Sequence, residues 1–132
     1  VASMAGFAPF SINAPYTAAK YGVVGLSQAL RHETEGLGVR MTLVCPGIVR
    51  TPFYDAIEIV GTDRETYMEF MPRRLITPDR AAEIILDGVA RKKTMIVFPF
   101  HAKMLWWISR LAPFVMTFIN RRMVREYRSL RG

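Results

Sequence analysis

The chain has 132 residues, 51% hydrophobic and 22% charged, which is enough apolar material for one folded domain and excludes intrinsic disorder. A single cysteine, Cys45, excludes an intrachain disulfide and a multi-cysteine zinc site, and favours a reducing compartment. The net charge of +7 is concentrated at one end, because residues 101–132 hold seven Lys and Arg against one acid, Glu126. A near-neutral body with a basic, apolar tail does not favour nucleic-acid binding.

The first elements are a strand end, a loop and a long helix. Residues 1–3 read as the end of a strand, and residues 4–14 are rich in loop-forming residues. A helix is predicted over 15–35, capped by Asn13 and ended by the glycines at 36 and 38. Its apolar face is predicted to consist of Ala19, Val23, Leu26 and Leu30.

The next elements alternate in the same way. Residues 39–45 form a short apolar strand, which is typical of a strand covered on both faces. An irregular stretch follows over 48–76, with a short helix near 64–70. Thr77 caps a helix that reaches the basic residues 91–93, and a last strand is predicted over 94–98. Strands that alternate with helices predict an α/β fold with a parallel sheet, of which three strands are too few to stand alone.

The strongest chemical signal is Tyr16-Thr-Ala-Ala-Lys20 on the first helix. Four residues turn a helix by about 400°, so Tyr16 and Lys20 share one face. An ammonium near a phenol lowers the pKa of that phenol, which lets it exchange a proton with an alcohol or carbonyl oxygen. Ser3 lies 13 residues earlier at a strand end, where its hydroxyl can hold the same oxygen. The alternative is an ordinary helix with a buried Tyr and a solvated Lys.

Four segments together resemble the C-terminal half of a short-chain dehydrogenase/reductase. They are Val1-Ala-Ser-Met-Ala-Gly6, Tyr16-Thr-Ala-Ala-Lys20, Val24-Gly-Leu-Ser-Gln-Ala-Leu-Arg31 and Val44-Cys-Pro-Gly-Ile-Val-Arg-Thr51. The resemblance covers residues 1–100. It implies a Rossmann-type doubly wound parallel sheet, here incomplete with its last three strands and their helices, followed by a helical tail over 101–132.

The resemblance also implies roles for individual residues. Tyr16 would be the general acid/base, Lys20 would tune it and hold the nicotinamide ribose, and Ser3 would stabilise the substrate oxygen. The cofactor implied is NAD(P)(H), with NADP(H) the preferred form. The residues expected to bind it, besides Tyr16 and Lys20, are Pro46, Gly47, Ile48 and Thr51. A plain turn after a strand is the alternative interpretation of Pro46–Gly47.

Three parts of the family pattern are missing from this sequence. The glycine-rich loop that cradles the pyrophosphate is absent, and so is the residue that selects NAD or NADP. The family's active-site asparagine is also missing, because Asn13 is not in its place. We therefore expect the chain to be part of a longer protein, and to be inactive by itself.

The tail over 101–132 is apolar, contains two Trp and ends in an arginine cluster. Its longest uncharged stretch, 111–120, is about half the ~20 residues needed to span a bilayer. One hypothesis is an interfacial helix on an anionic membrane surface. The other is packing against the missing half of the domain or a partner subunit. Nucleic-acid binding has no groove-reading motif in its favour.

The function predicted by the resemblance is hydride transfer between NAD(P)(H) and an alcohol or ketone substrate. The alternative is a non-catalytic membrane-peripheral or scaffold protein that retains the fold. We expect a homo-oligomer, a cytoplasmic location, with a membrane surface as one of the two hypotheses for the tail, and no metal, since His32 and His101 lack ligand spacing. An apolar or lipid-like substrate is suggested by the residues expected to close over it, and packing in the core is the alternative explanation of the same residues, which are Phe53, Tyr54, Tyr67, Met68, Phe70 and Met71.

Overall fold

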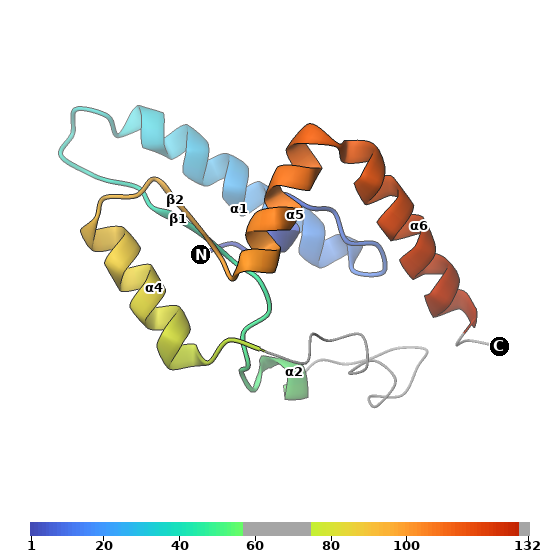
Figure 1. Ribbon diagram of the computed structural model, residues 1–132. Helices are drawn as coiled ribbons and strands as arrows, with labels where there is room; N and C mark the ends of the chain where they lie inside the picture. Colours follow the sequence, from blue (N-terminus) through green and yellow to red (C-terminus); the bar gives the residue numbers. More distant parts are fainter. Residues whose placement is uncertain (57–74, 130–132) are drawn as a thin grey trace.

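The computed structural model describes residues 1–56 and 75–129. A 3-10 turn, η1 (Met4–Gly6), is followed by α1 (Ala14–Glu33), β1 (Leu43–Pro46) and the short α2 (Phe53–Ala56). Then come α4 (Pro78–Ala90), β2 (Met95–Phe98), α5 (Phe100–Leu111) and α6 (Pro113–Ser129) (Figure 1). The helix predicted over 64–70 lies outside the described residues.

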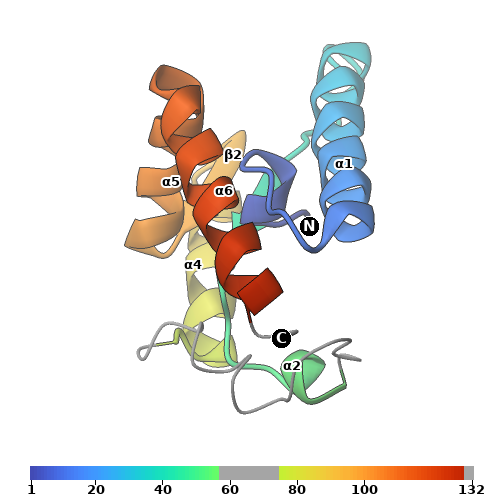
Figure 2. The same cartoon turned by 90° about the vertical axis from the view of Figure 1, so that its right-hand side faces the viewer.

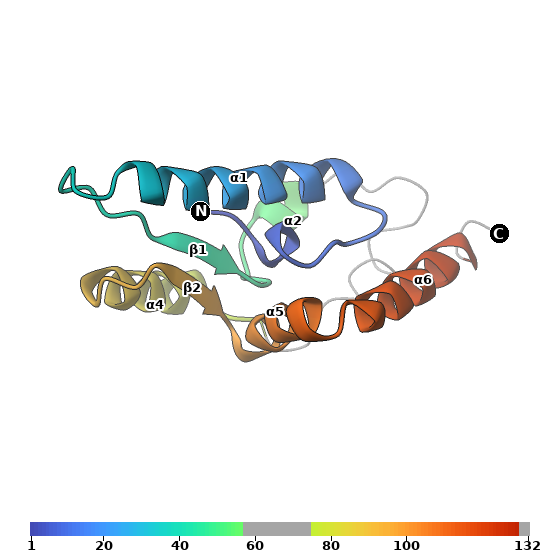
Figure 3. The same ribbon diagram turned by 90° about the horizontal axis from the view of Figure 1, so that it is seen from above.

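The two strands form a small parallel sheet with helices on both faces. Leu43 pairs with Met95 and Pro46 with Phe98. Figure 3 shows the layers from the side, with α1 on one face of the sheet and α4 on the other. The predicted α/β class with a parallel sheet is therefore confirmed.

Alternation along each strand builds two separate cores. Leu43 and Cys45 face α1, where they pack with Ala2 and with the partly buried Val23 and Val24. The intervening residues of both strands face α4. That second core consists of Val44, Ile96, Phe98 and Ala81, with Ile84 and Ile85 packed against it.

Three sequence predictions about these elements need correction. The strand predicted over 39–45 begins only at Leu43, because pairing starts where Leu43 N donates to Thr94 O (3.0 Å). Residues 1–3 form no strand and join β1 through one bond, Ala2 N to Val44 O (2.8 Å). The third correction concerns α1, whose predicted apolar face included Leu26, which is 61% exposed.

The helix starts also differ from one another. Thr77 caps α4 as predicted, because its side chain accepts a hydrogen bond from Arg80 N. Asn13 occupies the N-cap position of α1 but makes no capping hydrogen bond with its side chain.

The tail forms two helices, α5 and α6, which continue beyond the end of β2 (Figure 3). In Figure 2, α6 passes in front of η1. Asn120 fixes this position, because its side chain accepts from Ser11 N (2.7 Å) and donates to Pro9 O (2.8 Å). Met116, which belongs to α6, is buried. Among residues 1–56 and 75–129, no helix combines the length and apolarity needed to span a bilayer.

Candidate active site

Ser3 begins the turn that leads away from the sheet. It is the N-cap of η1, where its Oγ accepts a hydrogen bond from Ala5 N (3.2 Å). The side chain is half-buried. A hydroxyl that accepts one bond still carries a proton to donate, so Ser3 retains the capacity to hold a substrate oxygen.

Gly6 presses this turn against α1. A Cβ at position 6 would lie 2.6 Å from Val24 Cγ2 and 2.8 Å from the carbonyl oxygen of Lys20. Only glycine permits this approach of two backbones. The turn that carries Ser3 therefore rests on the part of α1 that carries Lys20. Gly6 ends the segment Val1-Ala-Ser-Met-Ala-Gly6 that resembles the family, but the sequence alone predicted no role for it.

Tyr16 and Lys20 meet on one face of α1, as their spacing predicts. The Lys20 ammonium lies 5.5 Å from the centre of the Tyr16 ring, and both side chains are half-buried. In the described part of the chain, Lys20 Nζ has no hydrogen-bond acceptor and no ion pair. An ammonium placed this way, with its donors unused, fits a ligand that offers hydroxyl oxygens, such as a nicotinamide ribose.

Phe53 completes the surroundings of Tyr16. The two rings lie 6.5 Å apart, centre to centre, at an interplanar angle of 38°. Phe53 belongs to α2, and half of its surface is exposed. Sequence reasoning placed Phe53 over the substrate but did not pair it with Tyr16. The other residues expected there lie outside the described residues, except Tyr54, whose side chain is also not described.

The segment expected to line the cofactor runs from β1 toward α2. Gly47 N donates to Phe98 O (2.6 Å), and Arg50 N donates to Ile76 O (2.9 Å). Ile48 and Thr51 are both half-buried. The segment thus begins at the carboxyl edge of the sheet and ends beside the helix that brings Phe53 to Tyr16.

Steric crowding by other residues of the chain explains why residue 47 is a glycine. A Cβ there would lie 3.0 Å from His101 Nε2, 3.1 Å from Pro99 Cδ and 3.2 Å from Ala102 Cβ. This crowding comes from the start of α5 and leaves the interpretation of Pro46–Gly47 as a simple turn open. His101 Nε2 is buried with no hydrogen-bond partner in the described part of the protein.

The other reactive side chains among the described residues do not form a second catalytic or metal-binding site. Cys45 is fully buried, and this burial raises the pKa of its thiol to about 11, so the thiolate is scarce near neutral pH. His32 is exposed at the end of α1. Across residues 1–56 and 75–129, no three His, Cys, Asp or Glu side chains are grouped to hold a metal ion.

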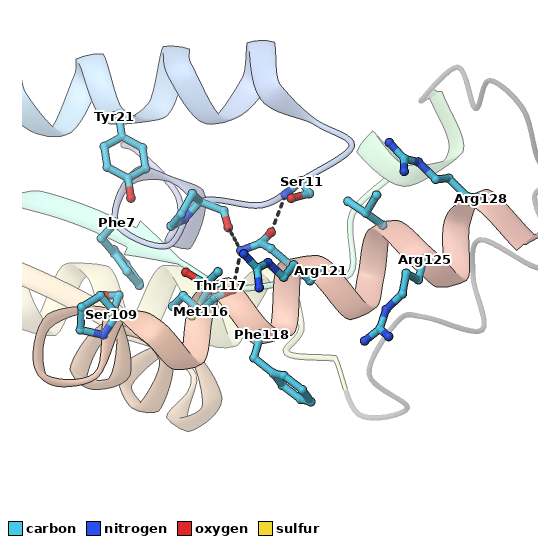
Figure 4. A pocket seen from close by; sticks show the side chains of 14 residues that line it. Phe7, Ser11, Tyr21, Ser109, Met116, Thr117, Phe118, Arg121, Arg125 and Arg128 are labelled. Atoms are coloured by element: carbon cyan, nitrogen blue, oxygen red, sulfur yellow. Dashed lines mark hydrogen bonds between the residues drawn. The ribbon is translucent and has the colours of Figure 1, made fainter.

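An open groove of about 1010 Å³ separates loop 7–13 from α6. Figure 4 shows Phe7 and Tyr21 on one side and Met116 on the other. The hydrogen bonds of Asn120 to Ser11 N and Pro9 O link α6 to loop 7–13 beside this groove. Burial raises the pKa of Tyr21 above its ordinary value. Ser3, Tyr16 and Lys20 do not line this groove.

Comparison with known proteins matches the region that holds these residues. A family profile described as "short chain dehydrogenase" matches residues 1–59. "Putative oxidoreductase SadH" of Mycobacterium tuberculosis is 33% identical over 116 residues, which cover 84% of this chain and 42% of that protein. "Short-chain dehydrogenase/reductase prx7" of Penicillium rubens is 35% identical over 88 residues, covering 67% of this chain and 28% of prx7.

A solved structure shares the fold. The "putative short-chain dehydrogenase" from Novosphingobium aromaticivorans aligns with a TM-score of 0.56 and 16% identity, over 99% of this chain and 47% of that one. The chain therefore spans less than half the length of the relatives that it matches.

Proposed function

The chain belongs to the short-chain dehydrogenase/reductase family and spans part of its domain, and from this premise we propose that the protein oxidises an alcohol or reduces a ketone with NAD(P)(H). The observation that carries the proposal is the pair on α1, with the Lys20 ammonium 5.5 Å from the Tyr16 ring and without a protein acceptor in the described residues. The names of the relatives, which are oxidoreductases, support the same class of reaction.

The proposed reaction uses three side chains, those of Tyr16, Lys20 and Ser3. The cofactor, when bound, supplies or accepts the hydride. The Tyr16 hydroxyl donates its proton to the carbonyl oxygen in reduction and becomes a phenolate, and in oxidation the Tyr16 phenolate accepts the proton of the alcohol. The positive charge of Lys20 stabilises the negative charge that forms on Tyr16. Ser3 donates a hydrogen bond to the same substrate oxygen.

The cofactor side is assigned to residues at the end of β1. Lys20 would hold ribose hydroxyls, and Pro46, Gly47 and Ile48 would line the nicotinamide, with Thr51 bonding its carboxamide or a phosphate. The position of this segment at the carboxyl edge of a parallel sheet supports the assignment, because ligands of such folds bind at that edge. We propose NADP(H) as the preferred form.

The substrate proposed is apolar or lipid-like. Phe53 stands beside Tyr16 with half of its surface open, so the carbon skeleton next to the reacting oxygen would meet an aromatic ring.

We also propose a homo-oligomer that uses α1. Its outward face carries small residues at helical spacing, which allow close approach of another helix: Ala18, Gly22, Gly25 and Ala29.

Replacing Tyr16 by Phe tests the catalytic assignment. Measured in the complete family domain that contains this chain, turnover of NADPH or NADH with a panel of aliphatic and cyclic ketones should fall by about 10²-fold or more, the usual contribution of a positioned acid. Binding of the cofactor, followed by its own fluorescence, should change little. Tyr21→Phe is the matched control, since it removes the same atom from the same helix, outside the Lys20 pair. Equal turnover in the two variants would contradict the role of Tyr16.

A further inference from the structure

One face of the tail is lined with large apolar side chains that nothing in the described part of the protein covers. Their exposed fractions range from 49% to 80%. The first four belong to α5 and the last two to α6, and within each helix they are three or four residues apart, which places them on one side of that helix. We call this set the apolar stripe: Phe100, Met104, Trp107, Leu111, Phe114 and Phe118.

The same spacing continues into a basic segment. Arg121, Arg125 and Arg128 follow Phe118 at intervals of three, four and three residues, and all three are exposed. None forms an ion pair with a described residue, whereas Arg122 is paired with Glu126 (2.7 Å). Figure 4 shows Phe118 and Arg125 projecting from the side of α6 that faces away from Ser11, whereas Arg128 points to the side on which Ser11 lies. Arg121 also lines the groove between α6 and loop 7–13.

From this juxtaposition we propose that α5 and α6 dock on an anionic lipid bilayer, with the apolar stripe among the acyl chains and the arginines on lipid phosphates. Large apolar side chains on one face, followed by unpaired cations, match the two zones of a membrane interface. No helix in the described part of the chain is suited to span a bilayer, so the contact is made in the plane of the surface.

The charges next to the stripe favour lipid over a second protein. Lys103 and Arg110 are both exposed on α5, and the guanidinium of Arg110 lies 4.8 Å from the centre of the Trp106 ring. Long cationic side chains can extend to the headgroups while their stems stay in the apolar layer. Lysine is depleted from protein–protein interfaces, and a second copy of this chain that docked through the same helix would bring no acid from α5 to pair with Lys103.

Contacts on the inner side of the tail keep the apolar stripe facing outward. The Asn120 side chain bonds to Pro9 O and Ser11 N, and Ala102 and Met116 are buried on the body of the protein. These contacts fix which side of α5 and α6 faces the protein. The stripe therefore cannot be withdrawn without breaking them.

Co-sedimentation with vesicles tests the proposal. The protein should bind vesicles of phosphatidylcholine with 30% phosphatidylglycerol and release from them at high salt. Binding to phosphatidylcholine alone should be much weaker. Both tryptophans of the chain lie in α5, so their emission should shift to the blue on binding. Failure to bind the anionic vesicles at low salt would overturn the proposal.

Two matched pairs of variants identify the surface. Trp107→Ser with Leu111→Ser should weaken binding by at least about tenfold, because both side chains leave the apolar layer. Leu86→Ser with Val89→Ser removes two equally exposed apolar side chains from α4 and should leave binding unchanged. Similar losses in the two pairs would overturn the assignment.

The arginines are tested in the same way. Arg121→Gln, Arg125→Gln and Arg128→Gln together should weaken binding to anionic vesicles by about 100-fold, from the usual contribution of each cation near such a surface. Arg40→Gln, Lys92→Gln and Lys93→Gln remove the same charge elsewhere and should have a far smaller effect. Self-association that requires the apolar stripe, without vesicle binding, would show that a second copy is the occupant and refute the lipid proposal.

Discussion

The helix α1 and the tail helices α5–α6 both present an exposed stripe, but the two stripes have opposite chemistry. On α1 the outward residues at positions 18, 22, 25 and 29 are Ala or Gly. On α5–α6 the equivalent stripe consists of aromatic and long aliphatic side chains followed by arginines. A surface of small residues suits close contact with another backbone. A surface of large apolar and cationic residues suits a soft, charged interface such as lipid.

The two regions are also attached to the body in different ways. α1 is held by packing, since Gly6 lets η1 approach the Lys20 carbonyl and Val24. α6 also buries Met116, but its link to loop 7–13 consists of the hydrogen bonds of one amide side chain, that of Asn120. Because packing and hydrogen bonds respond differently to substitution, the comparison can be tested at single residues.

The largest expected effect is that of Gly6→Ala. The added Cβ would collide with the Lys20 carbonyl oxygen, which belongs to the helix backbone and cannot rotate away. We expect the free energy of unfolding to fall by about 1–3 kcal/mol, as is typical of overpacked sites. Urea denaturation measures this change. Turnover should fall as well, because Ser3 moves relative to Lys20, and an unchanged protein would disprove this packing contact.

Asn120→Ala should have a smaller and more local effect. It leaves Ser11 N and Pro9 O without their partners, which costs about 1–2 kcal/mol at a partly exposed site. Hydrogen exchange at the Ser11 amide should become faster, while exchange in β1 stays slow. Asn13→Ala is the control, because that side chain makes no capping bond and its loss should be nearly neutral. Equal effects of the two changes would contradict the conclusion that the Asn120 hydrogen bonds hold α6 on loop 7–13.

The smallest effect is expected for Gly25→Ala on the outward face of α1. No atom lies within 4 Å of the added Cβ, so the change should stabilise the helix by about 0.5–1 kcal/mol. If α1 contacts a second copy, the same methyl should raise the dissociation constant of the oligomer, measured by sedimentation equilibrium. Association that is unaffected by the methyl group would show that this face is not the contact.

Local sequence patterns predicted most of the elements. The range predicted for α1 and the Thr77 cap of α4 agree with the structure, and the apolar runs became strands whose alternate residues face opposite helices. The juxtaposition of Tyr16 and Lys20 was also predicted, because two residues four apart on a helix share a face whatever surrounds them. These are properties of a single segment, and the order of residues within it is sufficient to determine them.

The relations between segments depended on the tertiary structure. Periodicity placed Leu26 on an apolar face of α1, but only the position of the small sheet decided that Val23 and Val24 pack and Leu26 stays exposed. Phe53 reaches Tyr16, and Asn120 reaches Pro9, across long stretches of chain. A repeat in the sequence shows which side chains share a side of a helix, whereas the direction of that side is set by what the rest of the chain packs against it.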